Sequence, residues 1–401
     1  MDLFLQYGHG MKAHSEDLIK SWDGGSVIFS PKNMSLEQMI KSSEKIKKFN
    51  GNVYLDPQFY IPHTGNGNLN EHSFWPQSYS TNIFLNGIGI SDMISTLVDD
   101  YLLPIQASAF IIPSLYLEKI DDDWNRLTDS FIEEAFKKNF HGDRILTLCI
   151  DDSILSSEES VNELFEKIEE YPVDGYYIIP KHPNNDYLVS DVSWLLNLID
   201  LCAAVKIQKK KIIIGYSSHQ FLLLALAKVD AIASGTWLKT RNFPLTDFDD
   251  SEEQDFARRT TWYYCPQALS EYQINYLDIA YRLGLLGSLK SPVKFGSTYS
   301  DILFGGAQPT TTNFREPDAF RHYLHCLKKQ CEESTQNTYE ATKDYLRILF
   351  ETADDLTGYF KHNGIRGKRR DFNEVAEANL SIIDAFDNLR GLVFKTSWNH
   401  I

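Results

Sequence analysis

Seven short apolar segments, rich in β-branched residues, recur along this chain, and each is followed by a helical pattern. Several of the segments lack polar alternation, which is typical of strands buried on both faces of a parallel sheet. A candidate eighth segment comes later and contains more aromatic residues. In chain order, the predicted strands are Ser26–Ser30, Val53–Asp56, Ile105–Ile112, Ile145–Asp151, Gly175–Pro180, Lys211–Tyr216, Ala231–Gly235 and the candidate Arg259–Cys265.

Strands that alternate with helices seven or eight times predict an α/β fold, and the pattern favours a closed (β/α)8 TIM-type barrel over an open sheet. From about Glu316 onward the strand signals stop and long amphipathic helices take over. We therefore predict a barrel over residues 1–290 and a C-terminal helical extension over residues 291–401. The predicted helices are Ser35–Lys48, Trp124–Phe140, Ser157–Glu170, Leu188–Val205, Glu316–Glu333, Thr338–His362 and Asn373–Leu389.

The composition indicates a globular protein of the cytoplasm. Hydrophobic residues make up 43% of the 401 residues, which is enough for a sizeable core. The longest apolar run, Phe221–Ala227, is far shorter than the ~20 residues that span a bilayer. The first residues, MDLFLQYGHGMK, do not resemble a signal peptide. The five cysteines are scattered and form no CxxC pair, which favours reduced thiols in the cytoplasm.

The net charge of −16 argues against a protein that works on nucleic acid. Such proteins normally present a positive face, because neutralising phosphates supplies much of their affinity. Two local basic runs exist, Lys206–Lys211 and Lys361–Arg370. Each is more typical of a solvated helix end or loop than of a phosphate site. We therefore expect that nucleic acid is not the partner of this chain, that any binding to RNA is weak and is lost with added salt, and that the chain does not bind a membrane.

Polar residues follow several of the predicted strands, where barrels carry their chemistry. Asp56 ends the second predicted strand, Asp151 and Asp152 end the fourth, and His219 follows the sixth. A single carboxylate in such a place often only caps the next helix. Asp56 together with the Asp151–Asp152 pair, converging on one barrel mouth, favours a functional site.

Taken in order, these strand ends resemble those of the tRNA-guanine transglycosylases, which exchange a guanine base for a 7-deazaguanine through a covalent aspartate intermediate. The family motif Asp-Ser-Gly-Gly-Phe-Gln is similar to the segment from Asp56 to Tyr60, in which the aspartate and Phe59 persist. The motif Phe-Asp-Glu-Cys, whose aspartate reads the guanine edge, is similar to residues 150–153. The resemblance runs from Gly25 to Leu286. It implies a base pocket that involves Asp56, Gln58, Phe59, Asp151, Asp152 and His219.

The same resemblance implies that the chemistry of the family is lost. Residues 212–242 parallel the family segment that carries its nucleophile, with Asp230 at the first aspartate of the motif and Arg241 near its end. The nucleophile itself falls on Ala233 or Ser234, and neither is a carboxylate that could attack the sugar carbon. Both glycine pairs that give the base room are also replaced. We expect no base exchange in RNA.

The zinc site of the family is equally incomplete. Only Cys265 remains of the cysteine cluster, and no histidine lies near it in the sequence. Zinc needs about four ligands in a structural site, so the alignment predicts no zinc and no other cofactor.

Divergent transglycosylase-like proteins of this kind occur in bacterial antiviral operons, notably type IV CBASS, beside a nucleotidyltransferase and a queuosine-pathway protein resembling 7-cyano-7-deazaguanine synthase. The resemblance therefore implies a homodimeric scaffold that binds a 7-deazaguanine-type ligand, one of those protein partners, or both. In that setting the base would be delivered to a protein rather than to a nucleic acid.

Two other hypotheses stay open. In the first hypothesis, the chain is an active transglycosylase on DNA or RNA, with Asp230 or Asp56 recruited as the nucleophile. Alternatively it is an unrelated barrel hydrolase or lyase that uses Asp56, Asp151 and His219 as acid–base groups.

Overall fold

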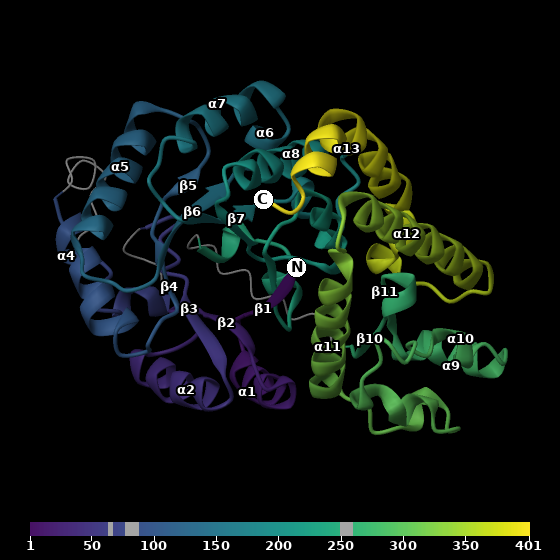
Figure 1. Cartoon of the computed structure of the whole chain (residues 1–401). Coiled ribbons are helices and arrows are strands. Elements are labelled where there is room, and N and C mark those ends of the chain that lie inside the picture. The colour runs from purple at the N-terminus through teal and green to yellow at the C-terminus, as the bar shows by residue number, and fades with distance from the viewer. Residues whose placement is uncertain (63–66, 77–87, 249–259) are drawn as a thin grey trace.

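The computed structural model describes residues 1–62, 67–76, 88–248 and 260–401. Eight parallel strands form a nearly closed barrel in the order β3-β2-β1-β9-β8-β7-β6-β4 (Figure 1). Between β3 and β4 the Ser108 amide donates to the carbonyl of Val53 at 2.7 Å, which draws the two ends of the sheet together. The chain is therefore a (β/α)8 TIM-type barrel with added C-terminal helices.

The elements fall into a barrel and a C-terminal unit. The strands are β1 (Asp2–Gln6), β2 (Gly25–Phe29), β3 (Gly51–Leu55), β4 (Ala109–Ile112), β5 (Tyr116–Leu117), β6 (Asp143–Ile150), β7 (Gly175–Pro180), β8 (Lys211–Ile214), β9 (Ala231–Ser234), β10 (Trp262–Cys265) and β11 (Ser270–Gln273). The helices are α1 (Met11–Trp22), α2 (Leu36–Lys48), α4 (Ile90–Thr96), α5 (Asp122–Lys137), α6 (Asp152–Leu155), α7 (Glu158–Ile168), α8 (Val192–Ile207), α9 (Ile274–Arg282), α10 (Leu286–Leu289), α11 (Glu316–Ser334), α12 (Tyr339–His362) and α13 (Ala376–Ser397).

The seven main strand predictions are confirmed as strands, although the third begins only at Ala109 and the sixth ends at Ile214. The candidate eighth strand is wrong. Trp262–Cys265 pairs antiparallel with β11 in a separate two-stranded sheet, and Arg259 lies outside the described residues. The place of the eighth barrel strand belongs to β1, which pairs with β2 on one side and with β9 on the other. Because β1 and β10 are both short and rich in aromatic or apolar residues, only their pairing partners distinguish the two strands.

The helix predictions are confirmed to within a few residues at most ends, and side-chain caps set several of their starts. Ser35 forms a capping box with Gln38 at the start of α2. Ser157 and Asp191 accept hydrogen bonds from backbone amides at the starts of α7 and α8. The last helix, α13, ends at Ser397 rather than at Leu389.

The C-terminal unit, residues 260–401, lies beside the barrel at the right of Figure 1, and buried side chains of α11, α12 and α13 belong to the same core as the barrel strands. A second cluster of buried side chains joins β10 and β11 to α12, through residues such as Tyr272 and Phe360. Helix α11 lies against both β1 and β10 and so connects the unit to the barrel. The division at residue 290 stays a prediction. Among the described residues, the helices are all too short or too polar to cross a membrane.

Candidate functional site

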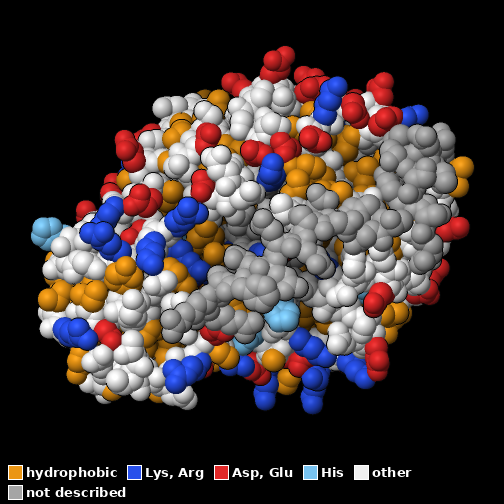
Figure 2. All heavy atoms as spheres, turned by 180° about the vertical axis from the view of Figure 1, so that it is seen from behind, with side chains coloured by type: hydrophobic (Ala, Val, Ile, Leu, Met, Phe, Trp, Pro, Cys, Tyr) orange, Lys and Arg blue, Asp and Glu red, His pale blue; other side chains and the backbone are white. Residues whose placement is uncertain are grey.

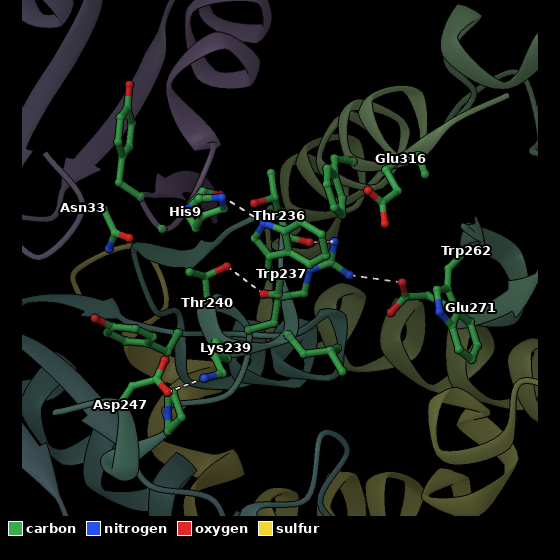
Figure 3. Close-up of a pocket in the computed structure, with 18 of the residues that line it drawn as sticks. His9, Asn33, Thr236, Trp237, Lys239, Thr240, Asp247, Trp262, Glu271 and Glu316 are labelled. Carbon is green, nitrogen blue, oxygen red and sulfur yellow. Dashed lines mark hydrogen bonds and ion pairs between the residues drawn. The ribbon is translucent and has the colours of Figure 1, made fainter. Parts of the chain in front are cut away.

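A pocket of about 600 Å³ opens at the carboxyl ends of the barrel strands, between the barrel and the C-terminal unit. In a TIM barrel this is the end where ligands bind. Figure 3 shows His9, Asn33 and Asp247 on the barrel side, and Trp262, Glu271 and Glu316 on the side of the C-terminal unit. The pocket therefore exists only where the two parts of the molecule meet.

One buried carboxylate holds this junction together. Glu271 of β11 accepts hydrogen bonds at Oε2 from Nη1 of Arg241 at 3.1 Å and from Nη1 of Arg370 at 2.9 Å. Its Oε1 accepts from the Tyr187 hydroxyl at 2.8 Å. Arg241 follows β9, Arg370 comes from the short turn between α12 and α13, and Tyr187 precedes α8. Three segments far apart in the sequence thus converge on Glu271.

Arg241 is held rigidly by the barrel. Its Nε donates to the carbonyl of Gly235 at 2.8 Å and its Nη2 to that of Thr236 at 2.9 Å, and the guanidinium stacks on Tyr323 at 3.4 Å from the ring centre. Gly235 is needed here because a Cβ would lie 2.6 Å from the carbonyl oxygen of Gln6. The absence of a side chain lets the end of β9 approach β1 and present Arg241 to the pocket.

The charges at this junction depend on one another. Burial alone would raise the pKa of Glu271, but Arg370 and Arg241 outweigh that effect and lower the pKa to about 2. His219 packs on Tyr264 nearby, and its own burial lowers its pKa to about 4. At neutral pH the junction therefore carries one carboxylate, two guanidinium groups and a neutral imidazole.

Aromatic rings line the pocket on both sides. Trp237 is half-buried, packs edge-on against Phe320 with ring centres 4.9 Å apart, and donates from its indole nitrogen to the carbonyl of His9. Trp262 is half-buried on the opposite wall, with the Arg370 guanidinium 3.9 Å from its ring centre. The two indoles give the pocket flat apolar surfaces beside its charged groups.

Asp56 lies beneath the pocket rather than on its wall. Its carboxylate is fully buried and accepts from the Tyr60 hydroxyl at 2.5 Å, the Gln58 amide at 3.0 Å and the Tyr177 hydroxyl at 3.3 Å. Burial raises the pKa of Asp56 to about 6, against these hydrogen bonds. The Gln58 side chain lines the pocket, with its amide nitrogen donating to Tyr216 at 3.1 Å.

Asp151 and Asp152 form a separate polar group at the end of β6. Lys181 bridges them, at 3.0 Å from Asp151 and 2.6 Å from Asp152, and the Tyr116 hydroxyl donates to Asp151. Burial opposes the ionisation of Asp151, but hydrogen bonds from Ser153 and Tyr116 hold its pKa well below its usual value. Neither aspartate lines the pocket.

The remaining expected ligand residues are buried in the protein. Phe59 packs edge-on against Trp75 and Phe131, away from the pocket wall. His219 lies among the tyrosines around Glu271. The structure thus brings His219 close to the pocket and Gln58 onto its wall.

Sequence reasoning missed Trp237, Trp262, Glu271 and Arg370. Glu271 lies in a short segment whose alternating pattern is typical of an ordinary edge strand. Arg370 is the last residue of a basic run, and such runs are usually exposed to solvent. The useful signal was Arg241, a charged residue directly after a barrel strand, which needs a buried counter-charge.

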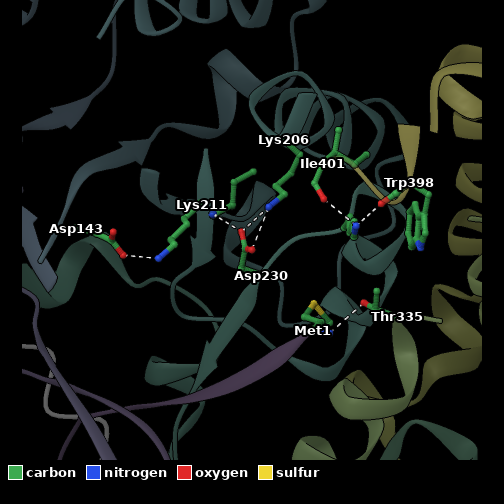
Figure 4. Close-up of polar contacts among 10 residues, drawn as sticks. Met1, Asp143, Lys206, Lys211, Asp230, Thr335, Trp398 and Ile401 are labelled. Atoms are coloured by element: carbon green, nitrogen blue, oxygen red, sulfur yellow. Dashed lines mark hydrogen bonds and ion pairs between the residues drawn. The ribbon is translucent and has the colours of Figure 1, made fainter. Parts of the chain in front are cut away.

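Asp230, the candidate nucleophile of the alternative hypothesis, lies at the amino ends of the barrel strands, directly before β9. Figure 4 shows its contacts with Lys206 and its neighbours. The Asp230 carboxylate accepts from the Lys206 ammonium at 2.9 Å and from the Ile212 amide at 2.8 Å. These contacts tie α8 to the amino ends of β8 and β9. Asp230 therefore has a structural task far from the pocket, whose walls follow the carboxyl ends of the strands.

The region expected to have lost its zinc holds Cys265, Cys326 and His322 in one buried cluster. The imidazole of His322 is engaged on both sides, by the Ser297 hydroxyl at 2.7 Å and the carbonyl of Tyr264 at 2.8 Å. No three histidine, cysteine, aspartate or glutamate side chains are placed so that they could hold one metal ion together, among the residues that the structure describes.

Basic side chains gather on the side of the molecule that carries the C-terminal helices, as Figure 2 shows from behind. Arg366, Lys368 and Arg369 are exposed in the connection between α12 and α13, directly beside Arg370. The other basic run includes Lys206, which is buried against Asp230, and Lys211, which pairs with Asp143. The run Lys361–Arg370 therefore borders the pocket, whereas the run Lys206–Lys211 forms ion pairs at the other end of the barrel.

No protein-family model matches this sequence, and no curated protein matches it. Among solved structures, the chain is similar to a fungal beta-1,4-galactanase, at 11% sequence identity and a TM-score of 0.34. The match covers 59% of this chain and 90% of that chain. A likeness this distant carries no argument about activity, so the transglycosylase resemblance rests on the sequence motifs.

We predict that Glu271→Gln destabilises the fold by about 3–5 kcal/mol, because two guanidinium groups would lose their buried counter-charge. Chemical denaturation measures the change. Glu316→Gln is the matched control, since Glu316 lines the same pocket without an ion pair among the described residues, and it should cost less than about 1 kcal/mol. Equal losses in the two variants would contradict the role given to Glu271.

The raised pKa of Asp56 predicts that the free energy of unfolding depends on pH. Because its pKa is raised to about 6, the folded protein keeps a proton that the unfolded chain loses at about pH 4. The unfolding free energy of the wild type should therefore fall as pH rises from about 4 to 6, with roughly 2–3 kcal/mol of the decline due to Asp56. In Asp56→Asn this part of the decline should vanish. Parallel curves for the two proteins across that window would rule the assignment out.

Proposed function

We propose that this chain is a transglycosylase-like scaffold that binds a 7-deazaguanine-type base in the pocket at the barrel mouth and does not exchange bases in RNA. The observation that carries the proposal is the pocket itself. Flat indole surfaces from Trp237 and Trp262 stand there beside hydrogen-bonding groups of Gln58 and Asn33. Stacking and edge hydrogen bonds are the two means by which proteins hold a nucleobase.

The arrangement of carboxylates supports binding rather than base exchange. Ala233 and Ser234 end β9 and are fully buried, and neither supplies a negatively charged oxygen. Asp230 is committed to Lys206 at the far end of the barrel. Asp56 is enclosed by tyrosines. A covalent mechanism would require one of these side chains to face a ribose carbon.

An active transglycosylase on nucleic acid is therefore the weaker alternative. Asp56 is its better nucleophile, because it lies on the pocket side of the barrel. The third hypothesis, an acid–base enzyme, uses Asp56, Asp151 and His219, which have separate partners. Neither alternative explains why the pocket wall is built from indoles and arginines.

Calorimetry of the full chain with 7-cyano-7-deazaguanine or guanine tests the proposal. We predict saturable binding to the wild type, weakened about tenfold or more in Trp237→Ala, because stacking on one aromatic side chain contributes about 1–3 kcal/mol. The exposed aromatic Tyr281, outside the pocket, supplies the control Tyr281→Ala, which should bind like the wild type.

The same preparation should incorporate no labelled guanine into tRNA. Absence of binding to both bases would overturn the proposal. A covalent RNA adduct that persists on denaturing gels and disappears in Asp56→Asn or Asp230→Asn would replace it with the active transglycosylase.

We place this binding function in bacterial antiviral defence, with a 7-deazaguanine synthase-like protein and a nucleotidyltransferase as the partners. The proposal rests here on the motif resemblance alone. A pocket formed at a junction between two units suits a protein that presents a base to a partner, because the ligand sits near the molecular surface rather than deep in the barrel. Nucleic acid has no part in this proposal, and the site needs no cofactor.

We propose a homodimer through the C-terminal helices. Leu389, Leu392 and Val393 lie on one face of α13, and Leu392 is 78% exposed. An exposed apolar stripe of this kind is typical of an interface. We predict that the wild type has a dimer mass by light scattering at micromolar concentration and that Leu392→Asp is a monomer. The exposed apolar residue Val293 lies outside α13, so Val293→Asp is the control that should stay dimeric. A monomeric wild type would contradict the prediction.

A further inference from the structure

The two arginines on Glu271 leave the junction with an excess of positive charge. One carboxylate faces two guanidinium groups, and the adjacent His219 is neutral because it is buried. A buried charge without a counter-charge is costly, so such a site favours an anion. The charged groups that line the pocket are Lys32, Lys239, Arg241, Arg370, Asp247, Glu271 and Glu316.

The two arginines are not equivalent. All three nitrogens of Arg241 donate to protein oxygens, and its side chain is only 2% exposed. Arg370 uses Nη1 on Glu271, is 18% exposed and lines the pocket. Its Nε and Nη2 have no hydrogen-bond partner in the residues that the structure describes. Those nitrogens are the donors with which a guanidinium grips a carboxylate or phosphate in a bidentate pair.

Arg370 is also pre-positioned. Glu271 fixes one edge of its guanidinium and the Trp262 ring supports its face at 3.9 Å. A side chain held in place by two contacts loses little further freedom when it binds a ligand, so its hydrogen bonds contribute more to affinity.

The two lysines of the pocket have other contacts. Lys239 is paired with Asp247, so the charge on that side is balanced. Lys32 stands over the Phe248 ring at 4.7 Å. Glu316, at the start of α11, lies on the same side of the pocket as Trp262 and Glu271 (Figure 3). Among the described residues of the C-terminal unit, Arg370 is thus the pocket cation whose guanidinium still has N–H groups that can donate to a ligand.

We infer that the pocket takes a heteroaromatic base that carries an anionic group, a carboxylate or a phosphate, and that Arg370 binds this group. The inference rests on the proposed function and narrows its ligand class. The ring lies against the indoles, and the anionic group reaches the guanidinium that stacks on Trp262. The carboxylate could belong to a substituted base and the phosphate to a nucleotide, so both sources are compared in the test.

Calorimetry with two matched pairs of ligands tests the inference. One pair is 7-cyano-7-deazaguanine and 7-carboxy-7-deazaguanine, and the other is guanosine and guanosine 5′-monophosphate. In at least one pair the anionic ligand should bind the wild type about tenfold or more tightly than the neutral one, as expected for charge-assisted hydrogen bonds. The pair that shows the preference identifies the source of the anion.

Arg370→Gln should abolish this preference, so that the variant binds the anionic and the neutral member of a pair with equal affinity. Arg369→Gln, which removes the same charge from the neighbouring exposed residue, should alter the preference by less than about twofold. Arg370→Lys keeps the charge without the planar donors and should retain only part of the preference, which provides a second variant if Arg370→Gln does not fold.

Equal affinities for neutral and anionic ligands in both pairs would overturn the inference and leave the proposed function intact. An equal loss of the preference in Arg369→Gln would also overturn it, because the anion would then respond to the general field of the basic run. Failure of all four ligands to bind would overturn the proposed function itself.

Discussion

The architecture of the candidate site depends on a buried carboxylate shared by two arginines. Glu271 comes from the small sheet of the C-terminal unit, Arg241 from the barrel and Arg370 from the turn between the last two helices. Charges taken out of water are stable only when they are paired and hydrogen-bonded, so each of these groups requires the others. The barrel and the C-terminal unit must therefore dock before the pocket has two walls.

This dependence explains why the pocket lies beside the barrel axis rather than over it. The centre of the mouth is filled by Asp56 and the tyrosines that enclose it. Tyrosine hydroxyls satisfy the carboxylate internally, and the free space shifts toward the ends of β1 and β9, where the C-terminal unit adds its indole. The pocket therefore lies at the rim of the barrel mouth.

Much of the barrel could be predicted from the sequence, because strands buried on both faces have a local signature. Gly175–Pro180 was predicted to the residue for this reason, since all six of its residues are buried. The strand Asp2–Gln6 was missed because five residues at the start of a chain have no preceding helix to mark the alternation. Trp262–Cys265 has a similar composition, and only its antiparallel partner reveals that it lies outside the barrel.

The site was less predictable because its residues meet only through tertiary packing. Glu271 and Arg370 are separated by 99 positions, and neither belongs to a motif. The strand-end rule located Asp56 and Asp151 correctly at the mouth, but it could not tell that tyrosines and Lys181 would occupy their oxygens. The most direct test of this account is a crystal structure of the full chain with 7-carboxy-7-deazaguanine or guanosine 5′-monophosphate. We predict density for the ring against Trp237 or Trp262 and for the anionic group within hydrogen-bonding distance of Arg370. Density centred on Asp56 and Asp151, with the junction pocket empty, would contradict it.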